Sequence, residues 1–152
     1  MYKRILVTLD GSELSEEVLP YAEDMAEKMK SEVVLLRVSP PPQALEENGR
    51  IIAPVDEEMD RIAIELGEYL NRIAYRLRAK AIPVRTAVKF GDAAEVIVDY
   101  ARESENGISL VAMCTHGRSG IKRWVYGSVA ERVLRGSSVP VLLIRSSGAK
   151  TE

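Results

Sequence analysis

The chain has 152 residues, 46% of them hydrophobic, and its 21 basic and 23 acidic side chains give a formal charge of −2. This length suits one domain with its own core, and the balanced charge argues against nucleic acid or a membrane surface as a partner. One cysteine excludes an internal disulfide and a multi-cysteine metal site. Because no apolar run could span a membrane and no signal-peptide pattern is present, we expect a cytoplasmic protein.

The first third of the chain predicts two strands separated by a helix. The first strand covers residues 4–9, and Ser12 in the Asp-Gly-Ser turn that follows is a predicted helix N-cap. Pro20 should kink or delay that helix, because it cannot donate a backbone hydrogen bond. The second strand covers residues 32–38. The stretch 39–55 contains three consecutive prolines and is too proline-rich for regular structure, so we expect a flap or a disordered insertion.

The rest of the chain continues the alternation of helices and strands. Two capping-box patterns mark helix starts, Asp92 with Glu95 and Ser128 with Glu131, so that both Asp92 and Ser128 are predicted N-caps. Gly136 is a predicted C-cap. The elements expected in order are a helix over 56–80, a strand over 83–89, a helix over 92–104, a strand over 108–113, a helix over 128–135 and a strand over 139–145.

This alternation is typical of a doubly wound α/β domain, in which helices cover both faces of a parallel five-stranded sheet. Ligands of such sheets bind beyond the carboxyl ends of the strands, where the winding reverses. If the first and fourth strands are neighbours, the Asp-Gly-Ser turn and the loop after the fourth strand face each other there. We expect a single domain over residues 1–146 and a flexible tail over 147–152.

Residues 114–128, with the sequence CTHGRSGIKRWVYGS, are the most informative stretch. Gly117 and Gly127 allow the backbone to approach a ligand closely, and the helix beginning at Ser128 offers free N–H groups and a positive dipole end to an anion. The pattern therefore predicts a phosphate cradle, although it is neither a G-x-x-x-x-G-K-[ST] phosphate loop nor a complete dinucleotide fingerprint. Positive charge in the same loop comes from Arg118, Lys122 and Arg123.

Four segments carry a resemblance to a known family: DGS at 10–12, THGRSG at 115–120, GSVAER at 127–132 and VPVL at 139–142. They resemble the universal stress protein family, and the likeness extends over essentially the whole chain. It implies a Rossmann-like, five-stranded domain of strand order 3-2-1-4-5 that usually forms homodimers. Some members of that family bind ATP or AMP, and others bind no nucleotide.

Nucleotide-binding members carry Gly, two residues, Gly, nine residues, and then Gly followed by Ser or Thr. Gly117, the nine residues 118–126 and the pair Gly127-Ser128 fit this motif. Cys114 stands where the first glycine would be and brings a side chain near the nucleotide. The nucleotide-binding residues that the resemblance implies are Thr8, Asp10, Val38, Cys114, His116, Gly117, Arg118, Gly127, Ser128 and Val129.

The resemblance also implies a role for the main parts of the site. Asp10 would contact the ribose or a metal, the main chain of Val38 would meet the adenine edge, and Thr8 would line the base pocket. ATP or AMP, with or without Mg²⁺, is the expected ligand, and no residue set indicates a separate metal site. The phosphates would be held by Gly117, Gly127 and Ser128.

Each of these residues also has an ordinary structural explanation. An Asp before Gly at a strand end is a common turn former, and Ser128 would cap its helix with or without a ligand. Val38 is a strand residue, and the cations of the loop could form a solvated face. We expect Trp124 and Tyr126 to pack under the loop and not to stack on adenine.

The only cysteine and the only histidine, Cys114 and His116, suggest a nucleophile and its base, but we do not expect a catalytic pair. Cys114 ends a buried strand, where a cysteine is most often a small hydrophobe, and nearby positions on a strand end seldom give a hydrogen-bonded pair. No loop residue stands out as a base to orient an attacking water, so turnover is not predicted, although slow ATP hydrolysis remains compatible with the site.

The last strand, from Val139 to Arg145, is short and apolar, and an edge of this kind favours antiparallel pairing with its copy in a homodimer. Pro140 limits that pairing because it has no N–H to donate. The expected function is that of a nucleotide-dependent stress-response regulator, acting through an unknown regulatory protein partner. The alternative is a nucleotide-free dimeric interaction module of the same fold, in which Cys114 marks the loss of the site.

Overall fold

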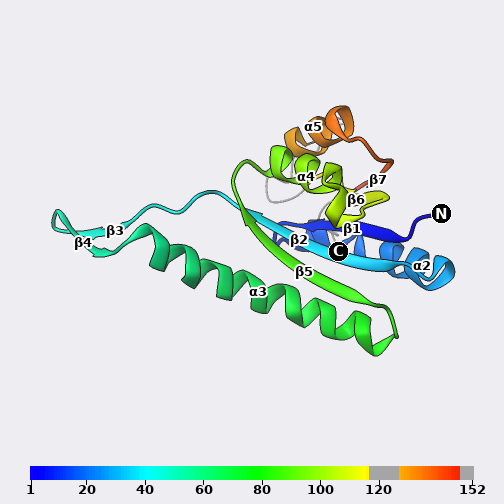
Figure 1. Ribbon diagram of the computed structural model, residues 1–152, viewed down its shortest axis with the longest axis horizontal. Coiled ribbons are helices and arrows are strands. Elements are labelled where there is room, and N and C mark those ends of the chain that lie inside the picture. Colours follow the sequence, from blue (N-terminus) through cyan, green and yellow to red (C-terminus); the bar gives the residue numbers. More distant parts are fainter. Residues whose placement is uncertain (117–126, 148–152) are drawn as a thin grey trace.

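A computed structural model describes residues 1–116 and 127–147 of the chain. Within them lies a parallel sheet of order β5-β2-β1-β6-β7 (Figure 1). Numbered among themselves, its strands have the predicted order 3-2-1-4-5, so the expected doubly wound α/β fold is confirmed. The strands are β1 (Arg4–Leu9), β2 (Glu32–Ser39), β5 (Val84–Phe90), β6 (Leu110–Cys114) and β7 (Val141–Ile144).

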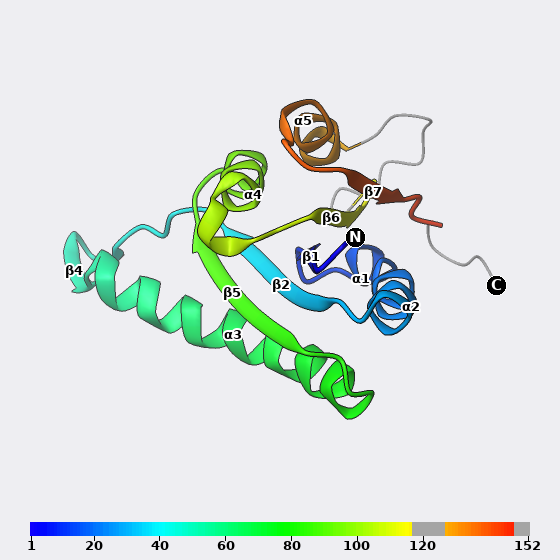
Figure 2. The ribbon, with the colours of Figure 1, turned by 45° about the vertical axis from the view of Figure 1, so that its right-hand side comes forward.

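Helices cover both faces of this sheet (Figures 1 and 2). Successive residues of β1 show the division: Ile5 and Val7 pack on the side of α2 and α3, whereas Leu6 packs on the side of α4 and α5. Because both faces are covered, the central strands are continuous apolar runs. The helices are α1 (Glu13–Glu16), α2 (Leu19–Met29), α3 (Val55–Ala79), α4 (Ala93–Arg102) and α5 (Ser128–Gly136), and a short 3₁₀ helix, η1, covers Ser104–Asn106.

Pro20 divides the first predicted helix into two. Ser12 caps α1 as predicted, because its hydroxyl accepts a hydrogen bond of 3.1 Å from the amide of Ser15. The regular helix then stops and resumes as α2 at Leu19, with Pro20 in the first turn. A proline is tolerated there because the first amides of a helix have no intrahelical acceptor.

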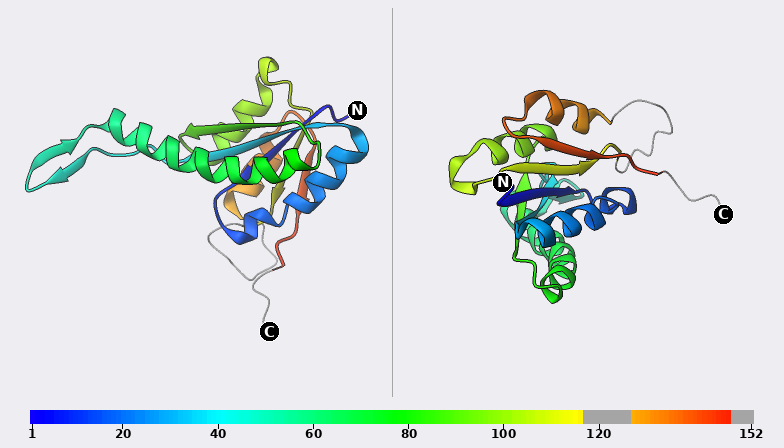
Figure 3. Two further views of the ribbon diagram at one scale, coloured as in Figure 1. Left: turned by 90° about the horizontal axis from the view of Figure 1, so that it is seen from below. Right: turned by 90° about the vertical axis from the view of Figure 1, so that its right-hand side faces the viewer.

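The stretch 39–55 was expected to lack regular structure, and this prediction is wrong for its second half. Strands β3 (Leu45–Glu47) and β4 (Arg50–Ala53) form an antiparallel hairpin (Figure 3). Asn48 and Gly49 connect them with φ angles of +53° and +76°. Two successive positive φ angles are the requirement of a tight hairpin turn, which Asn-Gly meets well. The hairpin turn therefore overrides the breaking effect of the prolines that precede it.

The N-cap predicted at Asp92 forms, whereas the one predicted at Ser128 does not. The carboxylate of Asp92 accepts a hydrogen bond of 3.0 Å from the amide of Glu95. At α5, the N-cap is Gly127, no described side chain caps the helix, and Ser128 is the first helical residue. Gly136 likewise ends α5 inside the helix and is not the C-cap, which is Ser137. In the described part of the chain, none of the helices has the length and apolarity needed to cross a membrane.

Candidate functional site

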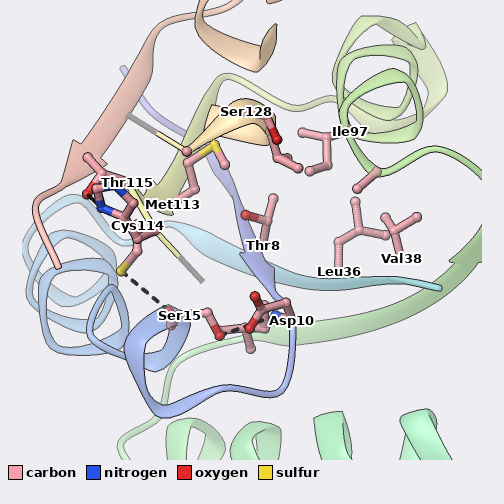
Figure 4. A pocket seen from close by; sticks show the side chains of 15 residues that line it. Thr8, Asp10, Ser15, Leu36, Val38, Ile97, Met113, Cys114, Thr115 and Ser128 are labelled. Carbon is pink, nitrogen blue, oxygen red and sulfur yellow. Dashed lines mark hydrogen bonds between the residues drawn. The ribbon is translucent and has the colours of Figure 1, made fainter. Parts of the chain in front are cut away.

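A cavity of about 300 Å³ lies at the carboxyl ends of β1, β2 and β6, where α4 and α5 begin (Figure 4). The sheet order makes β1 and β6 neighbours, which is the condition for the turn at residues 10–12 and the end of β6 to face each other. The crevice expected in a doubly wound sheet is therefore present at its switch point. The lining residues are Thr8, Leu9, Asp10, Ser15, Leu36, Val38, Ala93, Ile97, Met113, Cys114, Thr115, His116, Gly127, Ser128 and Val129.

The structure brings most of the predicted site residues together around this cavity. Gly117 and Arg118 lie outside the described residues, as do Lys122, Arg123, Trp124 and Tyr126 of the same loop. The predicted residues that line the cavity are Thr8, Asp10, Val38, Cys114, His116, Gly127, Ser128 and Val129.

One wall of the cavity is apolar and was largely missed by the sequence analysis. Leu36 and Val38 of β2, Ile97 of α4 and Met113 of β6 turn their side chains toward the same space (Figure 4). The period-2 alternation of a strand could have placed Leu36 beside Val38. Ile97 and Met113 could be found only once α4 was seen to pack over the sheet. A wall of this kind suits a flat, apolar ring.

Another part of the cavity wall is the amino-terminal end of α5, and Figure 4 shows Ser128 on the same side of the cavity as Ile97. The carbonyl oxygen of Gly127 accepts the first bond of the helix, 3.0 Å from the amide of Glu131. The earlier amides, those of Ser128, Val129 and Ala130, have no intrahelical acceptor, and no described side chain caps them. These donors and the positive end of the helix dipole favour an anionic group beside the cavity.

Gly127 contributes through its missing side chain. Its amide donates a hydrogen bond of 2.8 Å to the carbonyl oxygen of Thr115, so this N–H is engaged within the protein. A Cβ atom at this position would lie 2.7 Å from the same oxygen, which is too close for any side chain. The glycine therefore lets α5 begin directly against the end of β6, and the anion-binding amides are those that follow it.

Asp10 is held at the cavity edge by its own turn. Its Oδ1 atom accepts hydrogen bonds of 2.9 Å from the amide and 2.5 Å from the hydroxyl of Ser12. The amide of Asp10 donates to the hydroxyl of Ser15, which in turn donates to the carbonyl oxygen of Ser12. Gly11 has a φ angle of +87°, which a residue with a side chain rarely adopts. This network fixes the carboxylate. Asp10 therefore forms the turn, and the turn holds its carboxylate at the edge of the cavity.

The thiol of Cys114 points away from α5. Its Sγ atom donates a hydrogen bond of 3.5 Å to the carbonyl oxygen of Ser15, on the α1 side of the sheet (Figure 4). Burial raises the pKa of this thiol to about 11. A thiol with such a pKa stays protonated near neutral pH and is a poor nucleophile. The described imidazole contact of His116 is with the Thr115 hydroxyl at 3.1 Å, not with the thiol.

A second hydrogen-bond network joins the end of β6 to the segment after β7. The hydroxyl of Thr115, a residue only 4% exposed, accepts from the amide of Ser146 at 3.3 Å and contacts Nδ1 of His116. Ser146 also donates its hydroxyl to the carbonyl oxygen of His116 at 3.0 Å. Beyond it, the amide of Ser147 donates to the carboxylate of Glu17. The cavity wall is therefore fixed from two sides.

The residues that the structure describes contain no group of three or more His, Cys, Asp or Glu side chains placed to hold a metal ion. Asp10 is the carboxylate among the residues that line the cavity. The described site thus offers a ligand an apolar wall, one carboxylate and the uncapped start of a helix.

A model of the universal stress protein family matches residues 1–145. The chain belongs to the universal stress protein family. Its relatives include the universal stress protein YxiE of Bacillus subtilis, which is 28% identical over 150 residues, covering 95% of this chain and 100% of that one. The solved structure of MJ0577, a universal stress protein of Methanocaldococcus jannaschii, superposes with a TM-score of 0.82 at 27% identity and covers 98% of this chain and 99% of its own.

Two further solved structures that share the fold of the present chain are complexes with a nucleotide. One is a universal stress protein in complex with cAMP, with a TM-score of 0.63, 21% identity and coverage of 96% and 98% of the two chains. The other is a universal stress protein of Archaeoglobus fulgidus in complex with dAMP, with a TM-score of 0.65, 20% identity and coverage of 94% and 98%. At these identities the comparison establishes the common fold.

Proposed function

We propose that this universal stress protein binds ATP or AMP in the cavity at the carboxyl edge of its sheet. The observation that carries the proposal is the combination, in one cavity, of an apolar wall and an uncapped helix start. An adenine nucleotide has matching parts, a flat apolar base and an anionic phosphate. The family members solved with cAMP and dAMP support an adenine nucleotide as the ligand class.

The geometry suggests how the ligand is oriented. The base would lie between Val38 on β2 and Ile97 on α4, with the main chain of Val38 at its edge. The ribose would then lie near the carboxylate of Asp10, which accepts hydrogen bonds. The phosphates would reach the amides of 128–130 at the start of α5. Any bound Mg²⁺ would neutralise phosphate charge and reach the protein through Asp10.

We propose that occupancy of the site is a signal and that the ligand is not turned over. Hydrolysis needs a base that positions the attacking water. Among the described lining residues, Asp10 is oriented by Ser12, and the Nδ1 atom of His116 is engaged with Thr115. A nucleotide-dependent regulator of the stress response, acting in the cytoplasm, is the function that follows.

The regulator is proposed to act as a homodimer. β7 (Val141–Ile144) is an edge strand of the sheet, and its first three residues are only partly buried. Pairing of β7 with its copy across a two-fold axis would satisfy that edge. Because the segment after β7 is bonded to Thr115 and His116, such a dimer would sit close to the nucleotide site.

One observation favours the alternative of a nucleotide-free interaction module. Cys114 replaces the first glycine of the nucleotide-binding motif. In the structure its thiol lies on the α1 side, away from Ser128, so the Cys114 side chain does not occupy the α5 end of the cavity. We therefore prefer the hypothesis of nucleotide binding. The titration described next can still show that the protein is an interaction module.

Isothermal titration calorimetry with ATP, AMP and adenosine, with and without Mg²⁺, tests the proposal. Wild-type protein should bind AMP more tightly than adenosine, because the start of α5 holds the phosphate. Ala93→Leu fills the cavity from its rim and should weaken AMP binding by at least about tenfold. Ala79→Leu, the same change at the exposed end of α3, is the matched control and should bind normally. Absence of heat from wild-type protein with every nucleotide would establish the interaction module instead.

A further inference from the structure

Residues 45–68 form an arm that extends beyond the sheet. The arm consists of the β3–β4 hairpin and the first half of α3, and Figure 3 shows both reaching past the ends of the strands. The lengths agree, because α3 has 25 residues and spans about 37 Å at 1.5 Å per residue. The neighbouring strand β5 has 7 residues and spans only about 23 Å. Part of α3 therefore has no sheet beneath it.

Burial along α3 follows this geometry. The second half of the helix packs on the sheet, whereas Val55 and Ile64 in the first half are 41% and 64% exposed. The hairpin is equally open, with Leu45, Ile51 and Ile52 exposed by 46%, 64% and 60%. The apolar residues that α3 buries are Leu70, Ile73, Ala74 and Leu77.

The apolar face of α3 continues into the arm, where none of its residues belongs to the core clusters found among the described residues. Val55, Met59, Ile62 and Leu66 are spaced by four, three and four residues, the repeat of a helix seam that packs against another element. In the second half this seam covers the core. In the arm, Met59, Ile62 and Leu66 are only partly buried. An apolar seam thus continues along the arm, only partly buried, next to an exposed apolar hairpin.

The arm is strongly acidic. It has eight acidic and two basic residues, a net charge of −6, in a chain whose formal charge is −2. The acidic residues in the first turn of α3 interact favourably with the positive end of the helix dipole. Asp60, Glu65 and Glu68 lie beyond that turn, so the dipole does not account for them. Two such arms repel each other, so a second copy of the arm is a poor partner. A positively charged partner is attracted.

We propose that the arm is a docking surface for a cationic amphipathic segment of a partner protein, in which apolar residues alternate with Lys or Arg. The apolar side chains of that segment would cover the seam of α3 and the hairpin, and its cations would meet the surrounding carboxylates. None of the described residues that line the cavity belongs to the arm. The inference therefore stands apart from nucleotide binding.

A defined peptide tests this inference. The probe is a fluorescein-labelled, 14-residue helical peptide of Leu and Lys, and its control has the same Leu pattern with Glu in place of Lys. Fluorescence anisotropy should show that wild-type protein binds the Lys peptide, more weakly as salt rises, and not the Glu peptide. NMR shift changes on adding the Lys peptide should be confined to the amides of 45–68.

Neutral substitutions separate the two parts of the surface. Ile51→Ser and Ile52→Ser remove apolar side chains from opposite faces of β4, and at least one should weaken binding about tenfold or more. Tyr75→Ser, at a residue 76% exposed on α3 outside the arm, is the matched control and should have no effect. The double variant Glu57→Gln with Asp60→Asn, which removes two negative charges from the arm, should reduce both the affinity and its salt dependence.

Four results would overturn the inference. The first is equal binding of the Lys and Glu peptides, and the second is binding that neither isoleucine variant changes. The third is wild-type self-association, seen by light scattering, that Ile51→Ser or Ile52→Ser abolishes, because the arm would then be occupied by a second copy. The double variant Glu27→Gln with Glu105→Gln removes two exposed carboxylates outside the arm. An equal loss of binding in that variant would also contradict a specific arm surface.

Discussion

The amide of Gly127 donates a 2.8 Å hydrogen bond to the carbonyl oxygen of Thr115, which holds the start of α5 against the end of β6. A Cβ atom on Gly127 would lie 2.7 Å from that oxygen. The contact sets where the uncapped amides of α5 stand relative to the cavity. The position therefore links the stability of the fold to the geometry of the proposed phosphate site.

Gly127→Ala should impair stability and nucleotide binding together. The added methyl group must push α5 away from Thr115, and we expect the free energy of unfolding to fall by about 1–3 kcal/mol. AMP affinity should fall at least about tenfold as the amides of α5 move. Urea unfolding and calorimetry measure the two effects. Ser128→Ala is the control for stability, because Ser128 is an exposed first residue of α5, and its unfolding free energy should stay within about 0.5 kcal/mol of wild type. A fully stable Gly127→Ala protein would refute the contact as described.

Cys114 should be unreactive in the folded protein. Burial raises the pKa of its thiol to about 11, so the reactive thiolate is scarce near neutral pH. The alkylation rate with iodoacetamide at pH 7.5 should be roughly 100-fold or more below that of the guanidinium-unfolded chain. The folded rate should then rise with pH toward 11. The chain has one cysteine, so the mass increase measured by mass spectrometry reports alkylation of Cys114. Fast labelling of the folded protein at neutral pH would instead indicate a nucleophilic site.

The contact between Thr115 and His116 leads to a prediction about the tautomer of His116. The Thr115 hydroxyl accepts the amide hydrogen of Ser146, and we expect it to donate its own hydrogen to Nδ1 of His116. The uncharged ring then carries its hydrogen on Nε2, a buried atom with no hydrogen-bond partner among the described residues.

The chain has a single histidine, so ¹⁵N NMR of the imidazole reports this tautomer directly. We expect Nδ1 to show the shift of an unprotonated ring nitrogen and Nε2 that of a protonated one. Thr115→Val removes the donor and should produce a mixture of tautomers. Ser146→Ala keeps the amide that Thr115 accepts and should preserve the tautomer. A hydrogen on Nδ1 of the wild-type ring would show that the network runs in the opposite direction.

The pair Asp92 and Arg132 links α4 to α5 and should be visible in the acid limb of the stability curve. The guanidinium of Arg132 contacts both carboxylate oxygens, at 2.9 Å and 3.1 Å. This hydrogen bonding, followed by that from the amide of Glu95, lowers the pKa of Asp92 from its ordinary 3.8. The folded state holds the charged form, so the contribution is complete above pH 3.8 and is lost as the pH falls through the lowered pKa.

An NMR titration of the Asp92 carboxyl carbon measures this shift. Arg132→Gln should raise the pKa of Asp92 back toward its ordinary value, because the largest cause is removed. Arg135→Gln, which breaks the pair with Glu131 on the same helix, should leave it unchanged. An Asp92 pKa that does not respond to Arg132→Gln would mean that the backbone amide alone stabilises the carboxylate.

Local patterns in the sequence were sufficient for the strands of the sheet, whereas the strand order and much of the cavity came from the family resemblance. Continuous apolar runs identified the buried strands, and the resemblance named Thr8, Asp10 and Val38, which lie at or just beyond the converging carboxyl ends of parallel strands. Features that depend on packing could not be read in this way. Ile97 joins the cavity only because α4 lies over β2, and the direction of the Cys114 thiol depends on which face of β6 it occupies.

Two errors came from patterns with more than one structural solution. A Ser-x-x-Glu sequence can begin a helix at its N-cap or one residue later, and here the close contact of Gly127 with Thr115 places the cap at the glycine. The three prolines suggested an irregular stretch, but the turn at Asn48 and Gly49 favours a hairpin just beyond them. In both cases a backbone geometry outweighed a local preference.

Amide and methyl NMR spectra of the protein titrated with AMP test the central claim most directly, because they locate the ligand as well as detect it. The account predicts shift changes at the amides of 128–130, where the phosphate would bind, and at the methyl groups of Val38 and Ile97, where the base would lie. Adenosine should perturb the methyl groups and largely spare the amides. Shift changes that avoid both walls of the cavity, or a spectrum that AMP leaves unchanged, would contradict a nucleotide site at the carboxyl edge of the sheet.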